Sequence, residues 1–312
     1  MSGSGVQFLL RRTIGALGVA FGAITLVFAA LYWLPGDPAL LIAGDDAPQE
    51  VVAKIREKLG TDRPFVEQYA DYVGKIVRHG DFGDSYLTGE PVMHRIVAQL
   101  PATLELTLFA TVTALVLGVL AGAVAAVNQG RWVDHLLQST SLFLGSMPNF
   151  WFGILLILFF SVHLRWLPAI GNGSFAQLIL PSLCLGLGAA GDLARMTRDC
   201  ILDVLREPFV VTLRAKGLPE KLIRYRHVLR SAMIPVVTML GSRVGILLSG
   251  TVVIESLFAR QGLGRIISEA VGAKDIPMVL AAVLVASLFY ILINLLVDFS
   301  YSRIDRRVRL QG

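Results

Sequence analysis

Four ionisable residues lie inside segments that are otherwise strongly apolar: Asp192, Arg195, Arg243 and Glu255. Charged side chains are costly among apolar neighbours, so these four are candidates for contact with a polar substrate or a water-filled pathway. Asp192 and Arg195 are three residues apart, which puts them on one helical face and predicts an ion pair. The alternative is that the four lie near the membrane surfaces or brace a subunit interface, and the sequence leaves both open.

A proline–asparagine break interrupts another apolar segment, between Ser146 and Trp151. Backbone groups freed by such a break need protein or water partners at membrane depth. We therefore predict that Ser146, Met147, Pro148, Asn149 and Trp151 line a helix interface or the wall of a pore.

Recognisable catalytic and metal-binding motifs are absent from the sequence. Gly74-Lys75 is followed by Ile76 and lacks the upstream glycine of a nucleotide-binding loop, so this chain is not expected to hydrolyse ATP alone. The five histidines show no metal-ligand spacing. The two cysteines, Cys184 and Cys200, are predicted to be packing residues. We expect no catalytic residue, no metal ligand and no cofactor bound by this chain.

A basic stretch, Glu207–Pro235, separates two apolar segments and contains several helix breakers. A short helix is predicted over Pro208–Lys216, because proline suits the first turn of a helix. Phe209 and Leu213 are four residues apart and share a face of that helix. Gly217 is well placed to end it.

A second helix is predicted to start at Pro219 and to run through Arg230 into the next apolar segment. Its basic residues can meet lipid headgroups or an acidic partner. The whole stretch is therefore either an interfacial amphipathic helix without a protein partner or a docking element. The residues alone do not choose between these two.

The composition predicts a polytopic membrane protein. The chain has 312 residues, of which 54% are hydrophobic and 16% charged, whereas soluble domains carry about 25% charged residues. The net charge of +5 is explained by membrane topology, and no nucleic-acid partner is expected.

Apolar runs of about 20 residues can cross a membrane as helices. The first is longer than the apolar core of a cleavable signal, about 7–15 residues, and is predicted to remain uncleaved. The third is interrupted at the proline–asparagine break. Six spans are predicted: Thr13–Leu34, Thr103–Val127, His135–Val162, Leu178–Met196, Met233–Phe258 and Ile276–Ser300.

The segment between the first two spans is polar and is predicted to hold short helices. One lies between Pro48 and Gly60, a second runs from Pro64 to His79, and a third starts at Pro91 and ends at Pro101.

Lysine and arginine in the short loops set the orientation. Both termini and the basic stretch are predicted to be cytoplasmic, and residues 35–99 extracytoplasmic. The predicted organisation is an N-terminal tail and first span (1–34), an extracytoplasmic helical segment (35–99), a transmembrane domain (100–302) with a cytoplasmic loop (197–232), and a basic cytoplasmic tail (303–312).

The basic stretch resembles the cytoplasmic coupling loop of binding-protein-dependent ABC importer permeases, in the variant found in the peptide/nickel family. It departs from the general pattern in lacking a literal Glu-Ala-Ala, and its spacing from Gly217 to Pro235 is longer than in other branches. The resemblance extends over nearly the whole chain through short motifs in the family's order: Leu34-Pro35-Gly36-Asp37-Pro38, Gly80-Asp81-Phe82-Gly83, Leu100-Pro101-Ala102-Thr103, Ser146-Met147-Pro148-Asn149, Trp166-Leu167-Pro168, Leu213-Arg214-Ala215-Lys216-Gly217-Leu218 and Gly262-Leu263-Gly264-Arg265.

This resemblance implies an all-α type I importer permease of the bacterial inner membrane, which moves small peptides, nickel or nickel chelates. The implied partners are a second homologous permease, two cytoplasmic ATPases that hold ATP and Mg²⁺, an extracytoplasmic binding protein and the lipid bilayer. A gradient-driven secondary transporter of a small polar solute is the alternative. The residues implied to couple ATP hydrolysis to transport are Phe209, Leu213, Arg214, Ala215, Lys216, Gly217 and Leu218.

Overall fold

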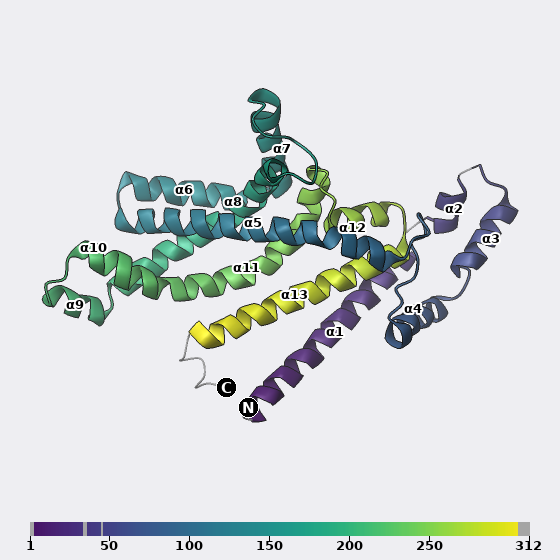
Figure 1. Cartoon of the computed structure of the whole chain (residues 1–312), viewed down its shortest axis with the longest axis horizontal. Coiled ribbons are helices and arrows are strands. Elements are labelled where there is room, and N and C mark those ends of the chain that lie inside the picture. Colours follow the sequence, from purple (N-terminus) through teal and green to yellow (C-terminus); the bar gives the residue numbers. More distant parts are fainter. Residues whose placement is uncertain (1–2, 34–35, 45, 305–312) are drawn as a thin grey trace. The chain divides into compact units, whose positions relative to one another are not determined.

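All regular elements are helical in residues 3–33, 36–44 and 46–304, which the computed structural model describes (Figure 1). The predicted basic tail beyond residue 304 lies outside the described residues, as do residues 34 and 35 of the first motif. The helices are α1 (Gly3–Trp33), α2 (Pro38–Ala43), α3 (Gln49–Leu59), α4 (Phe65–His79), α5 (Val92–Val127), α6 (Trp132–Ser146), α7 (Asn149–Leu156), η1 (Ile157–His163), α8 (Phe175–Leu205), α9 (Pro208–Ala215), α10 (Glu220–Leu222), η2 (Ile223–Val228), α11 (Leu229–Leu257), α12 (Leu263–Gly272) and α13 (Ile276–Ile304).

The long apolar helices coincide with the predicted spans. In the described part of the chain four of them are long and apolar enough to cross a membrane, and five if the bent pair α6 and α7–η1 is one span. Helix α1 also has an apolar stretch, Gly18–Trp33, which is shorter than these. The prediction of an all-α polytopic fold is confirmed.

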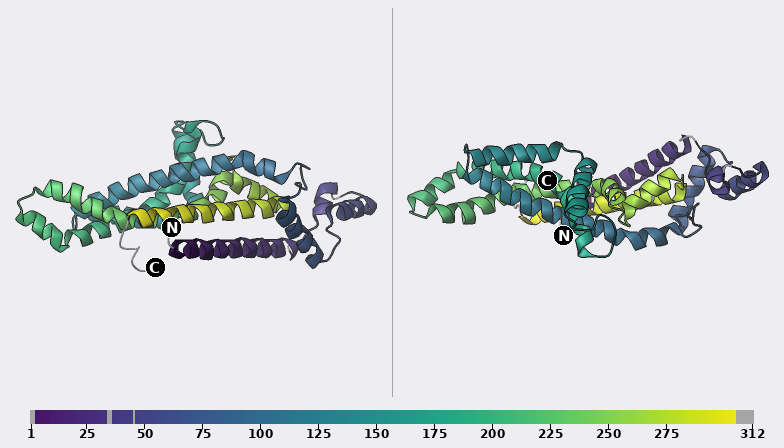
Figure 2. Two further views of the ribbon diagram at one scale, coloured as in Figure 1. Left: turned by 60° about the horizontal axis from the view of Figure 1, so that its bottom comes forward. Right: turned by 90° about the horizontal axis from the view of Figure 1, so that it is seen from above.

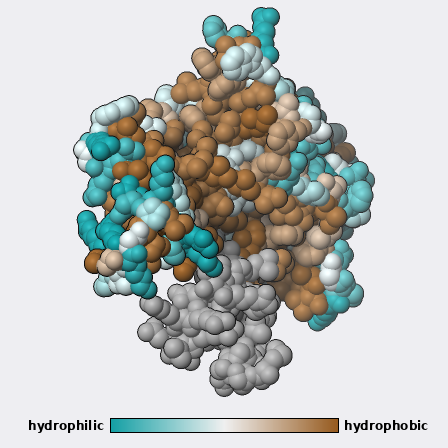
Figure 3. Space-filling view, turned by 60° about the vertical axis from the view of Figure 1, so that its left-hand side comes forward, coloured by the Kyte–Doolittle hydropathy of each residue, from teal (hydrophilic) through white to brown (hydrophobic). Residues whose placement is uncertain are grey.

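Helix α5 exposes apolar side chains along one face, at intervals of four residues: Leu108, Val112, Val116 and Leu120 are 48–61% exposed. Figure 3 shows that apolar side chains cover much of one face of the molecule, with hydrophilic groups mainly toward its margins. Continuous apolar surface of this kind is rare on soluble monomers and is expected where helices face lipid.

Pro101 does not end a helix, contrary to the sequence prediction. It lies inside α5, which continues unbroken to Val127. Proline removes one backbone hydrogen bond, but its fixed φ is compatible with a helix, and packing can outweigh the loss. Val92 and Ile96 before it and Leu106 after it are fully buried, so tertiary contacts hold both sides of the proline in helical form.

The third predicted span is broken where the sequence indicated. Helix α6 ends at Ser146 and α7 begins at Asn149, and the two segments are bent by 107°. The sequence predicted an interruption within one span, whereas the chain turns by more than a right angle at this point. Pro148 lacks the amide hydrogen that a continuous helix needs there.

The chain forms two compact units: residues 1–102 with 261–291, and residues 103–260 with 292–312. In the first unit, α1 and the first part of α13 lie side by side (Figures 1 and 2), and Ala20, Ile24 and Phe28 form a buried cluster with Leu280 and Leu284. Aromatic residues of α4 pack on the same cluster.

Helices α3 and α4 of this unit were predicted from the sequence and are confirmed, each ending at a glycine. Helix α12 was not predicted. Its buried residues Leu263, Ile266 and Ala270 are spaced by three and four positions, which is the periodicity that could have revealed it.

Asp275, just before α13, ties a loop of this unit to the helix. Its carboxylate accepts hydrogen bonds from the Ser85 hydroxyl and from the Tyr86 amide, the latter at 3.1 Å. Asp275 is 1% exposed, so these donors take the place of water around a buried charge.

Helix α8 is the centre of the second unit and packs against α6, α7 and α11. A Cβ added to Gly191 of α8 would collide with the carbonyl oxygen of Ser141 in α6. The absence of a side chain at this position therefore sets how closely these two helices approach.

Candidate functional site

Helix α9 is a short surface helix between α8 and α10, which lies beside it in Figure 1. It begins at Pro208, as predicted, and Lys216 caps its C-terminal end. Gly217 has φ of +75° and its amide donates to the carbonyl of Arg214. Residues with a side chain rarely adopt this left-handed conformation, so the glycine fixes where the helix stops.

Val210 anchors α9 to the second unit and is fully buried. Phe209 and Leu213 were predicted to share a face of this helix, but burial divides them: Phe209 is 39% exposed, while Val210 and the half-buried Leu213 pack inward. Leu213 lies between the two on the helical wheel, so only the position of the supporting helices decides which neighbour is buried. The cluster around Val210 consists of Ala126, Ile201, Leu202, Ile223, Val228 and Ala232.

The opposite face of α9 is open. Phe209 and Val211 are exposed apolar residues, at 39% and 60%. Thr212, Arg214, Ala215, Lys216 and Gly217 are exposed as well. This face thus presents apolar side chains together with cations, a combination that suits either a protein partner or lipid headgroups.

One ion pair joins α9 to the next helical segment, and a second lies within that segment and shares the same carboxylate. Arg214 Nε lies 2.6 Å from Glu220 Oε1, and Arg224 Nε lies 3.3 Å from Glu220 Oε2. Leu218, in the turn between them, packs partly against the Val210 cluster. The C-terminal end of the helix is thus held on the segment that leads into α11.

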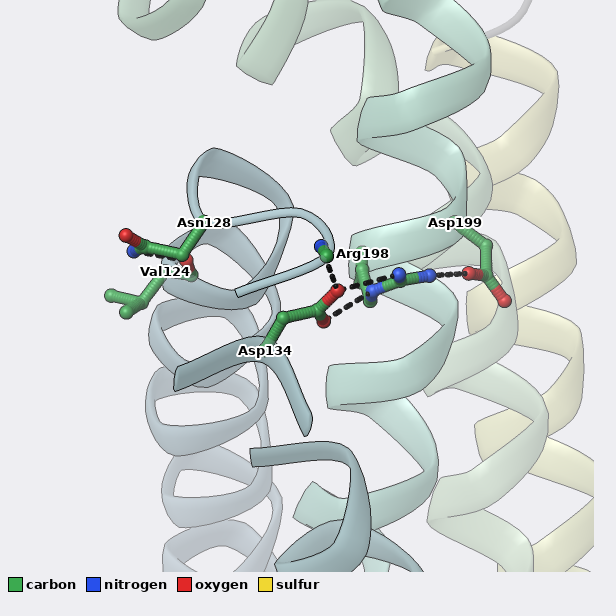
Figure 4. A network of polar contacts seen from close by, with 6 residues as sticks. Val124, Asn128, Asp134, Arg198 and Asp199 are labelled. Atoms are coloured by element: carbon green, nitrogen blue, oxygen red, sulfur yellow. Dashed lines mark hydrogen bonds and ion pairs between the residues drawn. The ribbon is translucent and has the colours of Figure 1, made fainter. Parts of the chain in front are cut away.

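A buried ion pair lies close to the same end of the second unit (Figure 4). Arg198 of α8 donates to both carboxylate oxygens of Asp134 of α6, at 2.7 and 2.8 Å. Asp134 also accepts from the Gly130 amide at 3.0 Å, and Arg198 reaches Asp199 at 3.0 Å. The network fixes the α5–α6 turn to α8, and the sequence analysis did not identify it.

Three of the four intramembrane ionisable residues meet. Arg195 Nη2 is 2.6 Å from Asp192 Oδ1, which confirms the predicted pair, and Arg243 Nη2 of α11 is 3.0 Å from Asp192 Oδ2. All three side chains keep some exposure, between 23% and 40%. One carboxylate therefore holds two cations on a partly open face shared by α8 and α11.

Asn149, at the α6–α7 break, lies near the same two helices. A Cβ added to Gly188 of α8 would be 3.3 Å from Asn149 Oδ1, and one added to Gly250 of α11 would be 3.9 Å from Nδ2. Gly188 and Asp192 are one helical turn apart, so the amide and the charge cluster follow one another along α8.

The other residues of the break are mostly exposed. Ser146 donates to the carbonyl of Leu142 in its own helix. Pro148 and Trp151 are exposed, and Met147 is half-buried.

Glu255 has a different environment from the other three ionisable residues. It is fully buried and accepts a hydrogen bond from Thr103 of α5 at 2.6 Å. This contact braces α11 against α5 within the chain.

The described residues contain no group of three or more His, Cys, Asp or Glu side chains able to hold a metal ion. Cys184 is buried and donates to the carbonyl of Asn149, while Cys200 is half-buried, so both pack as predicted.

Comparison with known proteins gives two matching sequence families. The family described as "Binding-protein-dependent transport system inner membrane component" matches residues 114–310, and its N-terminal counterpart matches residues 5–107. The chain is 42% identical over 304 residues to the glutathione transport system permease protein GsiC of Escherichia coli K12, which covers 97% of this chain and 99% of that protein. The protein of the same name in Shigella dysenteriae matches equally.

Solved structures give the same fold. The MetNI methionine ABC transporter, in an inward-facing conformation, aligns with a TM-score of 0.58 at 19% identity, over 68% of this chain and 97% of that chain. A second crystal form of that transporter aligns with a TM-score of 0.56 at 24% identity.

Proposed function

Because the chain belongs to the family of binding-protein-dependent transport system inner membrane components, and is an ABC importer permease subunit of the inner membrane rather than an ATPase, we propose that α9 is its coupling helix. One observation carries this proposal: Val210 ties α9 to the helix core, while Phe209, Val211 and Arg214 remain exposed for a partner. An ATPase that docks on this face can move α8 and α11 through the buried cluster.

The proposed assembly has a second homologous permease, two cytoplasmic ATPases that carry ATP and Mg²⁺, and an extracytoplasmic binding protein. Residues 197–232 then face the cytoplasm and residues 35–99 the exterior, as the loop arginines favour. Closure of the ATPases moves the coupling helices as rigid bodies and switches the pathway between inward and outward openings.

Gly217 provides the sharpest test of coupling. No heavy atom lies within 4 Å of a Cβ built there, so a large side chain meets no atom of the permease and projects from the proposed docking face, although the φ of +75° strains it. We expect Gly217→Trp to lower uptake strongly while ATPase subunits still assemble with the permease. Gly217→Asn is the matched control, because asparagine tolerates φ near +75°.

Uptake and ATP hydrolysis are measured together in proteoliposomes that contain the complete transporter. Normal uptake by the Gly217→Trp variant would remove the coupling assignment. Uptake driven by an ion gradient without ATP would instead support the secondary-transporter alternative.

We also propose that Asp192, Arg195, Arg243 and Asn149 contribute to the translocation pathway, together with the break residues Ser146, Met147, Pro148 and Trp151. Their partial exposure along α8 and α11 supports this role. Glu255 is assigned to bracing because it is buried against Thr103. Arg243→Gln is expected to lower uptake while Ser256→Ala, an exposed change on the same helix, leaves it unchanged.

The proposed cargo is a small peptide. The identity to a glutathione transport permease over nearly the whole chain supports a peptide, and nickel or a nickel chelate is the competing cargo. Thermal shift of the cognate binding protein with glutathione, simple dipeptides and nickel chelates decides between them. Stabilisation by nickel chelates alone would overturn the peptide proposal.

A further inference from the structure

A small cavity lies within the second unit, beside the elements that carry α9. Its volume is about 220 Å³, or roughly seven water-sized volumes. We call its apolar lining residues the floor and its polar or basic lining residues the rim. The floor residues are Ala123, Ala126, Val127, Ile201, Leu205 and Leu229, and the rim residues are Gln129, Arg131, Arg224 and Tyr225.

The charges around this cavity are predominantly positive. Arg131 has no ion pair in the part of the chain that the structure describes, and Arg224 reaches only one oxygen of Glu220, at 3.3 Å. Asp134, one turn after Arg131, is already engaged by Arg198 at 2.7 Å. The described residues that line the cavity include two arginines and no carboxylate, so its cationic groups can accept an anion from outside.

We propose that this cavity binds a phosphate ester anion, and specifically the headgroup of an anionic phospholipid. Arginine matches the geometry of phosphate oxygens and can donate two parallel hydrogen bonds to them, and the Tyr225 hydroxyl is a further donor. The apolar floor favours a lipid over free phosphate. The volume admits the phosphate and glycerol, while Val127, 42% exposed at the edge, offers apolar surface to the acyl chains.

The site is linked to the coupling helix, and this part of the inference rests on the function proposed for α9. Ala126 and Ile201 belong both to the cavity floor and to the cluster around Val210. Arg224 shares Glu220 with Arg214 at the end of α9. An anion bound to Arg224 competes with Glu220 for that arginine. Glu220 is then released from Arg224 and can pair more strongly with Arg214, so the bound lipid strengthens the ion pair at the end of α9.

Binding is tested on the complete transporter in phosphatidylcholine nanodiscs. The fraction of phosphatidylglycerol with brominated acyl chains is increased in steps, and tryptophan fluorescence is measured at each step. Trp132 is 74% exposed and adjacent to Arg131, so bromine quenches its fluorescence when the lipid is bound. The part of the quenching that disappears in Trp132→Phe reports on lipid near Trp132, and the share of it that loss of Arg131 and Arg224 removes reports on the cavity.

Arg131→Gln with Arg224→Gln is the test variant. Loss of each arginine is expected to weaken binding about fivefold. Lys221→Gln with Arg226→Gln is the matched control, since it removes the same charge from nearby exposed positions outside the cavity.

Coupled ATP hydrolysis is expected to respond to phosphatidylglycerol in the wild type and the control, and not in the test variant. Equal quenching in test and control variants would overturn the site. If added inorganic phosphate displaces the brominated lipid and abolishes the quenching at equal concentration, the lipid assignment is overturned. If the test variant loses its ATPase subunits, the cavity belongs to the subunit interface instead. If quenching persists while Gly217→Trp transports normally, the lipid site stands and its link to coupling falls.

Discussion

The Asp134–Arg198 pair provides the most direct test of how the second unit is held together. The carboxylate side chain is only 3% exposed and the guanidinium 19% exposed. The same guanidinium also contacts Asp199, whose side chain is 64% exposed. One arginine thus has a buried and an exposed carboxylate partner at similar distances, 2.7 and 3.0 Å.

Loss of the contact with Asp134 should lower the free energy of unfolding several times more than loss of the contact with Asp199. Arg198→Ala leaves the buried Asp134 carboxylate with the Gly130 amide as a much weaker partner, and breaking a buried pair in this way costs about 3–5 kcal/mol. Asp134→Asn should cost less than Arg198→Ala, because Arg198 keeps Asp199 as a partner, but more than the loss of the exposed pair. Asp199→Asn should cost about 0–1 kcal/mol, as expected for an exposed ion pair.

The assay is denaturant unfolding of the purified permease in detergent micelles, followed by tryptophan fluorescence. Replacing both residues by apolar ones, Asp134→Leu with Arg198→Met, should cost less than Arg198→Ala, because no buried charge is left without a partner. If Asp134→Asn is no more destabilising than Asp199→Asn, burial does not control the strength of this pair and the reasoning is wrong.

Three further predictions follow from burial and close packing. Val210→Ala should weaken the packing of α9 on the helix core by about 2 kcal/mol, because two methyl groups are lost and a cavity remains. Uptake should then fall more than the amount of ATPase subunit bound, when both are measured in proteoliposomes. Gly191→Ala should lower the thermal stability of the purified permease, because its Cβ meets the Ser141 backbone, whereas Gly74→Ala, with open space around it, should not; equal melting temperatures would contradict the close approach of α6 and α8. Asp275→Asn should increase protease cleavage of the loop around Ser85, because the buried carboxylate accepts a hydrogen bond from the Ser85 hydroxyl. Unchanged cleavage would show that the loop is held in another way.

Most of the helices could be predicted from local sequence. Apolar runs, and the prolines and glycines that flank short helices, act over a few residues and do not depend on distant contacts. The limits of α3, α4 and α9 were found in this way. Helix α12 was missed, and Pro101 was misjudged because burial on both sides of the proline outweighed its local tendency to end a helix.

The candidate site was predictable only in part. The position of α9 and its termination at Gly217 follow from its own residues. The pairing of Asp192 with Arg195 also follows, because both lie on one helix. The contact of Asp192 with Arg243 was not predictable, since it joins helices separated by many residues.

The sequence by itself determined that this chain is an all-helical membrane permease, because its apolar runs and ordered motifs are local properties of the chain. Tertiary structure alone decided which charges are buried, which are exposed and which meet. Val210 instead of Phe209 anchors α9, Asp134 finds Arg198 on another helix, and Glu255 is buried against Thr103. The physical reason is that desolvation and ion pairing depend on neighbours brought together by folding, and spacing along the chain does not specify them.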